Sequence, residues 1–271
     1  MGFIGFTGTL ILSSWLIRGV KASQWDGQGQ FGWVIQAEEI QVKIIIPNQG
    51  KLVTLIIPNN TIVKVGFGFG EYRLNKVYEL GKLENQAGKV LIRTVQEFLG
   101  VGIKGWQVGT KSNLSWWDKF RLKWLETLTV NQTKAIELKD QASWQPEHLS
   151  DGSLIYRVNQ AWLDELIHQE TFDQEVSQEG LTVAVLNASG VDGVANDISR
   201  LISNLGIEVR LVSNLAAQDQ SEVVISQKSQ KDTRTLKKII GSLGINTVRV
   251  SDTLEQRSDI VVIVGRDYTY L

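Results

Sequence analysis

Short apolar runs dominate residues 30 to 65 and are typical of strands. The three longest runs occupy residues 31–37, 42–47 and 52–58. They are rich in β-branched side chains, which favour strands over helices. The Pro-Asn-Gln-Gly sequence at 47–50 predicts a hairpin turn between the second and third runs. Residues 61–65 continue as a short extended piece, and the glycines at 66, 68 and 70 predict a flexible loop after it.

Helical spacing replaces this pattern after residue 88. Leu91, Val95, Phe98 and Leu99 recur at the spacing of one helix face. Gly100 ends this helix, because glycine readily adopts the positive φ of a C-terminal cap. Strands followed by a helix in this order predict a layered α/β or α+β unit.

A second amphipathic helix is predicted over residues 114–128. Side chains spaced by three and four residues form its apolar face, namely Trp117, Phe120, Trp124 and Leu128. The cations at 119, 121 and 123 lie toward other faces. The pattern favours a helix that packs this aromatic face against the core of the first unit. Two alternatives remain: a helix in the lipid headgroup region, with Trp117, Phe120 and Trp124 at the membrane interface, or a helix that binds an anionic polymer.

The N-terminus carries an apolar stretch that is compatible with a membrane. Residues 2–17 contain no charge, and Arg18 and Lys21 follow them. As a helix this stretch would measure about 24 Å, slightly short of the ~20 residues that cross a bilayer. We expect residues 1–22 to be a membrane segment or signal anchor, with a buried core element as the alternative. The charges at 18 and 21 favour a cytoplasmic location for the C-terminal side of this segment. Further Lys or Arg residues upstream of residue 1 would favour the opposite orientation, so the topology stays open.

The last third of the chain contains an internal repeat. Residues 201–212 recur as residues 239–250, and strands are predicted before each copy at 183–187 and 222–226. Each copy places a Leu-Gly pair at the end of its helix and a strand after it. With a final strand at 259–265, the pattern predicts a repeated β-α-β domain with both helices on one face of the sheet.

Composition places the domain boundary and removes several classes of protein. All nine tryptophans lie between Trp15 and Trp162, and residues 165–179 are polar and acidic, so we place the boundary near 175–180. The 28 Lys and Arg residues balance 29 Asp and Glu residues, which disfavours a nucleic-acid-coating protein. Without cysteine, and with only His148 and His168, the chain has no disulfide, zinc ribbon, thiol nucleophile or histidine metal cluster.

Part of the first unit resembles the LytR-CpsA-Psr cell-envelope family. The segments that carry the resemblance are residues 56–60 (Ile-Ile-Pro-Asn-Asn), residues 72–75 (Tyr-Arg-Leu-Asn), Val77-Tyr78 with Gly81, and residues 95–100. Enzymes of this family transfer a glycopolymer from a polyprenyl pyrophosphate to peptidoglycan. They hold the pyrophosphate with several arginines and a metal with carboxylates, which together neutralise the charge that moves during phosphoryl transfer.

The departures from the family pattern argue against catalysis. The family's Arg-Asp pair is replaced by the uncharged Asn59 and Asn60, and its later arginine elements have no counterpart between residues 109 and 151. Arg73 is the matching cation, and one cation cannot balance a diphosphate. The resemblance therefore implies a degenerate unit with no catalytic residue, in which Asn59, Asn60, Arg73 and Asn75 are the candidate ligand-binding residues. Alternatively, Arg73 is a surface charge. An active enzyme would need a carboxylate and further cations near Arg73, for which the candidates are Lys64, Lys76, Lys82 and Arg93.

The C-terminal repeat resembles the LytR-type domain often attached to these proteins. The matching residues are 183–191 (Val-Ala-Val-Leu-Asn-Ala-Ser-Gly-Val), Gly193, Ala195, Leu205-Gly206 and 259–268. This resemblance covers nearly all of residues 180–271.

Together these patterns predict a fold of α/β and α+β class: a membrane segment (1–22), a small strand-helix layered unit (30–175) and a repeated β-α-β domain (180–271). The resemblance implies a bacterial cell-envelope protein in the cell membrane, single-pass, with its main body outside the cytoplasm. Expected partners are the lipid bilayer and a polyprenyl-phosphate lipid or cell-wall glycopolymer, not nucleic acid. We expect a non-catalytic binding or organising role, without cofactor or metal. The alternative is an active phosphotransferase that uses Mg²⁺ and moves polyprenyl-pyrophosphate-linked glycopolymers to the cell wall.

Overall fold

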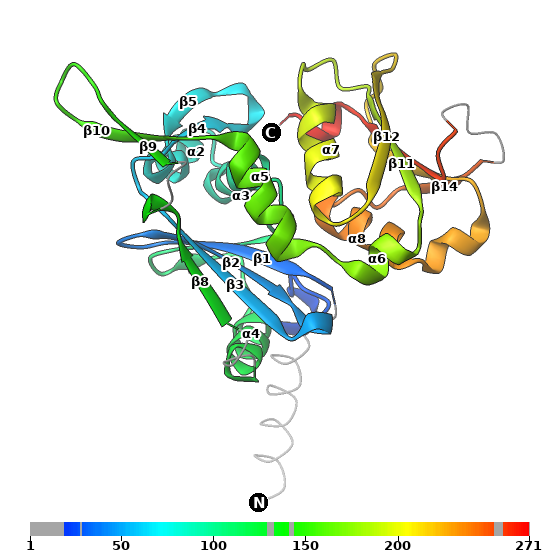
Figure 1. The fold of residues 1–271 in the computed structure, drawn as a ribbon, viewed down its shortest axis with the longest axis horizontal. Coiled ribbons are helices and arrows are strands. Elements are labelled where there is room, and N and C mark those ends of the chain that lie inside the picture. The colour runs from blue at the N-terminus through cyan, green and yellow to red at the C-terminus, as the bar shows by residue number, and fades with distance from the viewer. Residues whose placement is uncertain (1–18, 28, 129–132, 141–143, 252–256, 271) are drawn as a thin grey trace, which may run out of the picture.

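The computed structural model describes residues 19–27, 29–128, 133–140, 144–251 and 257–270, which form two α/β units side by side (Figure 1). The strands of the first unit are β1 (Phe31–Gln36), β2 (Ile40–Ile46), β3 (Lys51–Ile57), β4 (Ile62–Val65), β5 (Gly70–Arg73), β6 (Gly105–Val108), β7 (Lys111–Ser112), β8 (Thr133–Glu137), β9 (Trp144–His148) and β10 (Leu154–Val158). Its helices are α2 (Val77–Leu83), α3 (Ala87–Leu99), α4 (Trp116–Leu128) and α5 (Gln160–Thr171).

A mixed sheet in the order β7-β6-β1-β2-β3-β8 forms the centre of the first unit. Strands β1, β2 and β3 are antiparallel neighbours, and a 3₁₀ turn at Pro47–Gln49 joins β2 to β3. Gly50 follows with a φ of 60°, so the predicted hairpin is present. The predicted glycine loop is instead the tip of an ordered hairpin, because Gly70 already begins β5, which pairs with β4.

Side chains alternate between the two faces of this sheet, and a helix covers each face. In β2, Val42, Ile44 and Ile46 join the core beneath α2 and α3, whereas Ile45 joins a second core with Leu122 of α4. Figure 1 shows α2 and α3 on one side of the sheet and α4 on the other. The first unit is therefore a three-layer structure.

The orientation of α4 differs from the favoured prediction. Phe120, Trp124 and Leu128 are exposed, and α4 instead buries Asp118 and Leu122. The prediction that the aromatic face closes the core is therefore wrong. Its physical cause is Asp118, whose hydrogen bonds hold the opposite face of the helix inward.

The second unit agrees closely with the predicted repeat. Its elements are α6 (Gln174–Gln178), β11 (Thr182–Asn187), α7 (Val194–Asn204), β12 (Glu208–Asn214), β13 (Glu222–Ile225), α8 (Arg234–Leu243), β14 (Val248–Val250) and β15 (Ile260–Val264). The strand order is β12-β11-β15-β13-β14. Each β-α-β copy contains a parallel pair, and β15 lies between the copies, parallel to β11 and antiparallel to β13. Both helices pack on one face of the sheet in a shared core, as predicted.

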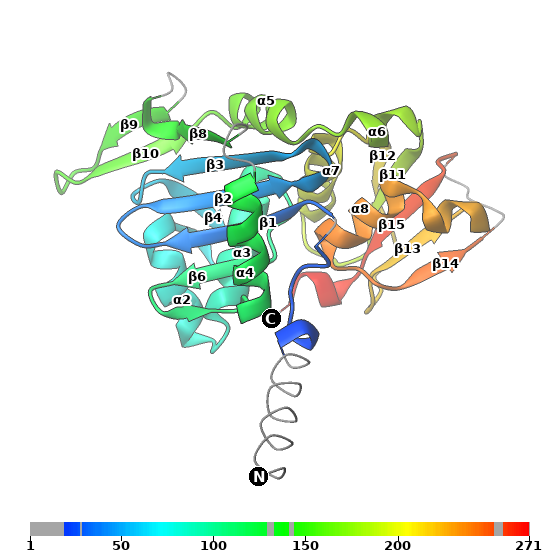
Figure 2. The same cartoon turned by 90° about the horizontal axis from the view of Figure 1, so that it is seen from below.

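Side chains of α3 and α7 join the two units. Arg200 of α7 donates from Nη2 to the carbonyl oxygens of Glu97 and Phe98 at 2.7 and 2.9 Å. Asn204 donates from Nδ2 to the carbonyl oxygen of Gly100 at 2.9 Å. Figure 2 shows the two sheets flanking this junction. Along the chain, the side chains of α5 belong to the first core, and Val176 of α6 belongs to the second.

The predicted membrane segment at 1–22 falls almost entirely on residues 1–18, which lie outside the described residues. In the part of the chain that the structure describes, no helix combines the length and apolar character needed to cross a membrane.

Candidate functional site

The structure brings together the four residues predicted to bind a ligand. Asn59 and Asn60 follow β3, whereas Arg73 ends β5 and Asn75 lies in the 3₁₀ turn (Leu74–Lys76) that follows β5. The backbone N–H of Asn75 donates to the carbonyl oxygen of Asn59 at 3.1 Å, and that of Leu74 donates to Thr61 at 2.8 Å. We call these four residues the asparagine cluster.

Side chains of the asparagine cluster form hydrogen bonds within the protein. Arg73 donates from Nη2 to the Oγ of Ser153 at 2.6 Å. Asn60 donates from Nδ2 to the carbonyl oxygen of Leu154, next to Ser153 in the β9–β10 hairpin. Asn59 donates from Nδ2 to the carbonyl oxygen of Glu38 at 2.6 Å. These contacts join the end of β3 to two neighbouring turns.

The buried side-chain polar atoms that have no partner in this cluster are acceptors. Among the described residues, Oδ1 of Asn59, Oδ1 of Asn75 and Oε1 of the adjacent Gln36 are buried without a hydrogen-bond partner. A pyrophosphate is itself rich in acceptors and requires donors and cations. The asparagine cluster therefore has the wrong polarity for the site that the family resemblance describes.

The donor set also fits Mg²⁺ poorly. Magnesium sites in proteins use one or two carboxylates, whereas the free oxygens here belong to uncharged amides. No group of three or more His, Cys, Asp or Glu side chains within the described ranges is arranged to hold a metal.

The further cations proposed for an active enzyme form other contacts. Lys82 pairs with Glu79 at 2.6 Å, and Arg93 pairs with Glu97 at 2.6 Å. Arg93 also donates to the carbonyl oxygen of Tyr268 at 3.0 Å, which places it at the junction of the units. Lys64 lines a separate cavity of about 290 Å³. Lys76 is exposed at the start of α2.

Two of the three carboxyls that line the cavity with Lys64, those of Glu97 and Asp197, have raised pKa values. Burial raises the pKa of Glu97, although Arg93 opposes this effect. Burial likewise raises the pKa of Asp197 despite the nearby Arg200. These groups lie where α3 meets α7, and Arg200 also bonds the α3 backbone there. Their arrangement is that of a structural junction.

A second cavity between the units is rich in cations, and we call it the basic cleft. Its volume is about 590 Å³. One wall comes from residues 25, 26, 29 and 30, the β2–β3 turn and Lys104, and the other from Asp173, which caps α6, and from α8. Its charged and polar lining residues include Asp26, Gln30, Asn48, Lys104, Asp173, Arg234, Lys237 and Lys238.

The four cations of the basic cleft have different environments. Lys238 pairs with the buried Asp173 at 2.5 Å, and Arg234 pairs with Glu175. Lys237 is exposed. Burial lowers the pKa of Lys104, although Asp26 opposes this shift. A partly desolvated ammonium such as that of Lys104 gains most from an anion that enters the cleft.

An unpartnered amide adds neutral hydrogen-bonding capacity to the cleft. Both polar side-chain atoms of Gln30 are buried, and neither has a hydrogen-bond partner among the described residues. An amide can donate to a phosphate oxygen and accept from a sugar hydroxyl. The cleft thus combines the cations and the neutral donors that a phosphorylated sugar polymer would use.

The sequence alone did not reveal the basic cleft. Arg234, Lys237 and Lys238 belong to the helix of the second repeat, where charges between apolar positions normally indicate a solvated face. Lys104 lies in a loop of the other unit, more than a hundred residues earlier. Their convergence depends on how the two units pack.

Comparisons with known proteins identify the second unit. Residues 180–268 match the family described as LytR cell envelope-related transcriptional attenuator. The protein is therefore a two-unit α/β protein whose second unit is a LytR-type C-terminal domain. The match confirms the predicted LytR-type C-terminal domain at residues 180–268.

Solved structures give more distant likenesses, and no curated protein matches the chain. TagT from B. subtilis is 12% identical over 52% of this chain and 89% of that chain, with a TM-score of 0.42. TagT with bound octaprenyl pyrophosphate lipid is 12% identical over 52% of this chain and 88% of that chain, with a TM-score of 0.41. A transcriptional regulator from Enterococcus faecalis is 10% identical over 66% of this chain and 88% of that chain, with a TM-score of 0.42.

Proposed function

We propose that this protein is a membrane-tethered cell-envelope protein that binds a phosphate-bearing envelope glycopolymer, or its polyprenyl-phosphate precursor, without transferring it. The observation that carries the proposal is the convergence of four cations on the basic cleft between the units. The family match at residues 180–268 supports a role at the cell envelope. The apolar residues 2–17 support the membrane tether.

Binding without transfer follows from how the cations are distributed. Phosphoryl transfer depends on several cations and a metal held on the same pyrophosphate. In the asparagine cluster, the guanidinium of Arg73 instead bonds Ser153, and the buried polar atoms without a partner are amide oxygens, which accept hydrogen bonds. The basic cleft has cations, but its carboxylates, Asp26 and Asp173, lie beside Lys104 and Lys238. Its chemistry is that of anion recognition.

Binding titrations with the full chain in detergent test this proposal. The ligands are a teichoic-acid-type phosphodiester polymer, a polyprenyl phosphate and inorganic pyrophosphate, each with and without Mg²⁺. Comparing them separates recognition of the polymer from recognition of the lipid precursor or of phosphate alone. We expect binding that does not require Mg²⁺ and that weakens as ionic strength rises, because salt screens the charges.

A matched pair of variants assigns the binding to the cleft. Lys104→Gln with Lys237→Gln removes two cleft charges, and Lys228→Gln with Lys231→Gln removes two exposed charges elsewhere on the second unit. We expect the first pair to weaken binding about tenfold, equivalent to about 1.4 kcal/mol, and the second to change it less than about twofold. Equal losses in both pairs would contradict a cleft site, and transfer of the polymer to peptidoglycan would contradict binding without catalysis.

A further inference from the structure

Helix α4 exposes an apolar stripe on the surface of the first unit. Phe120, Trp124 and Leu128 are 56%, 60% and 64% exposed. Trp117 continues this row and stacks on Phe120, with ring centroids 5.7 Å apart and ring planes 16° from parallel. We call these four residues the α4 stripe. Four large apolar side chains in one row indicate a surface that another apolar phase covers.

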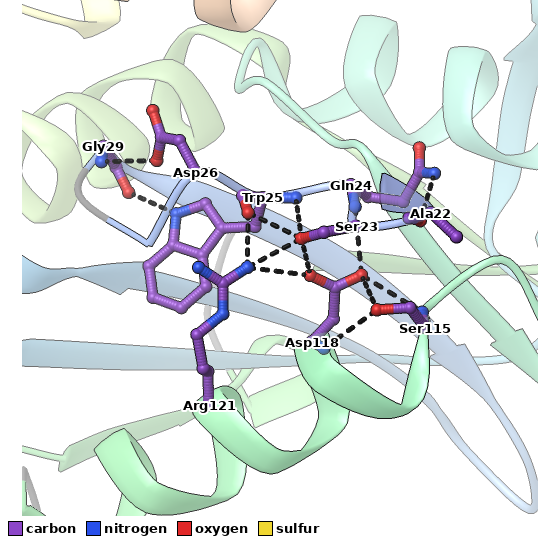
Figure 3. Close-up of polar contacts among 9 residues, drawn as sticks. All are labelled: Ala22, Ser23, Gln24, Trp25, Asp26, Gly29, Ser115, Asp118 and Arg121. Atoms are coloured by element: carbon purple, nitrogen blue, oxygen red, sulfur yellow. Dashed lines mark hydrogen bonds and ion pairs between the residues drawn. The ribbon is translucent and has the colours of Figure 1, made fainter. Parts of the chain in front are cut away.

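The opposite face of α4 is held against the protein. Asp118 is fully buried and accepts hydrogen bonds from the Oγ of Ser23 at 2.5 Å and the backbone N–H of Gln24 at 3.0 Å (Figure 3). Farther along the helix, Glu126 pairs with Lys43 of the central sheet at 2.7 Å. These contacts prevent α4 from rotating its stripe into the core.

The same contacts fix where the chain leaves the first unit toward its N-terminus. Arg121 donates to the Oγ of Ser23 at 2.7 Å and to the carbonyl oxygen of Trp25, next to Asp118 (Figure 3). Residue 19 lies against the start of α4, since a Cβ atom on Gly19 would be 1.9 Å from Nε1 of Trp116. The described chain therefore starts, at residue 19, directly beside α4, and the uncharged residues 2–17 precede this point in the sequence.

We propose that the α4 stripe lies in the headgroup region of the bilayer that holds residues 2–17, so that α4 is a second membrane contact of the protein. Tryptophan and phenylalanine favour this region, where their rings meet both lipid and water. Lys119 and Lys123 are exposed on the neighbouring face, where they can contact anionic lipid phosphates. This inference rests on the membrane tether in the proposed function, and it adds a fixed orientation of the first unit on the membrane.

Single-cysteine labelling tests the inference cleanly, because the natural chain contains no cysteine. The full chain carries Phe120→Cys or Trp124→Cys with an environment-sensitive fluorophore. Leu83→Cys is the matched control, since Leu83 is an apolar residue that is 77% exposed on α2 rather than α4. Each labelled protein is reconstituted into vesicles of equal parts phosphatidylcholine and phosphatidylglycerol, and flotation confirms its association with lipid.

The expected result is a blue-shifted emission at positions 120 and 124 that spin-labelled lipids quench, with neither effect at position 83. Proteins that float with the vesicles but show no quenching at 120 and 124 would overturn the stripe contact and leave the tether intact. Proteins that do not float would remove the tether and the stripe contact together. Shielding of both probes in detergent, together with a dimeric mass, would assign the stripe to a second copy of the chain and overturn the proposal.

Discussion

At the scale of residues, the burial of one carboxylate decides which face of α4 meets solvent. Asp118 is fully buried, and Ser23, Gln24 and Ser115 donate hydrogen bonds to it. Apolar periodicity identified the helix, but periodicity cannot tell a core face from an exposed one. A charged residue predicts the exposed face only when it lacks such partners, because paired carboxylates can be buried. The prediction that the aromatic face of α4 is buried failed because Asp118 has these partners and is buried in its place.

Asp118 also makes the position of α4 sensitive to acid. Burial alone would raise the pKa of Asp118, but the hydrogen bonds from Ser23, Gln24 and Ser115 outweigh burial and hold it below its ordinary value. A lowered pKa stabilises the fold above the ordinary carboxyl pKa of about 4, and this stabilisation is lost as pH falls through the lowered value. We expect Asp118→Asn to lower the free energy of unfolding by about 2 kcal/mol at neutral pH, with a gap that narrows below about pH 4. Chemical denaturation of both proteins at several pH values measures this gap, and a gap independent of pH would contradict the role of the charge.

Arg73 illustrates how a residue that resembles a ligand site can serve the fold. Its guanidinium bonds Ser153, and the carboxylate of Asp151 accepts from the backbone N–H of Ser153 at 2.9 Å. We expect Arg73→Ala to lower the free energy of unfolding by about 1 kcal/mol, because Ser153 loses its partner, and to leave polymer binding unchanged. Thermal melts and the binding titrations decide the question together. Weaker polymer binding with an unchanged melting temperature would instead identify the asparagine cluster as a ligand site.

At the scale of elements, long buried strands and repeats were predictable, and short edge strands were not. The strands β1, β2 and β3 have continuous apolar runs because helices cover both of their faces. The second unit was predicted strand by strand because its repeat supplied two copies of each signal. In contrast, β8 (Thr-Lys-Ala-Ile-Glu) is mostly polar and lies at the edge of its sheet. Its sequence therefore lacks the alternation of apolar and polar residues that predicts a strand.

Gly100, which ends α3, is important both for the backbone conformation of the helix cap and for the contact between the two units. Gly100 has a φ of 64°, and a Cβ atom there would be 2.7 Å from Nδ2 of Asn204 in the second unit. We expect Gly100→Ala to lower the free energy of unfolding by about 2 kcal/mol, from backbone strain and from displacement of Asn204. Gly109→Ala is the control, since Gly109 has a φ of 56° and open space around it, and strain alone should cost it about 1 kcal/mol. Equal losses at the two glycines would show that the contact with Asn204 adds nothing.

At the scale of the whole molecule, the packing of the two units creates features that neither unit has alone. Lys104 from one unit and Lys237 from the other line the same basic cleft. No local sequence pattern reports which residues of the two units come together in the fold. The motifs therefore predicted the asparagine cluster as the ligand site instead. The family of the second unit was predictable, because consecutive residues carry its resemblance.

Cooperativity between the units is predicted to depend on Arg200. Its guanidinium bonds the carbonyl oxygens at the end of α3 and pairs with Asp164 of α5 at 2.8 Å. We expect the wild-type chain to melt in a single transition and Arg200→Ala to melt in two, because each unit has its own core. Calorimetry of Arg210→Ala is the control, since Arg210 is exposed on β12 and forms a local ion pair with Glu208. A single transition in Arg200→Ala, at an unchanged temperature, would contradict this role.

Hydrogen exchange of the full chain, with and without the phosphodiester polymer, tests the central claim most directly, because it reports which backbone segments the ligand protects. The proposed function predicts slower exchange on both walls of the basic cleft, in residues 25–30 and around Lys104 on one side and in α8 on the other. The backbone around Asn59, Asn60, Arg73 and Asn75 should exchange as it does without ligand. Protection of the asparagine cluster with an unchanged cleft would contradict the account.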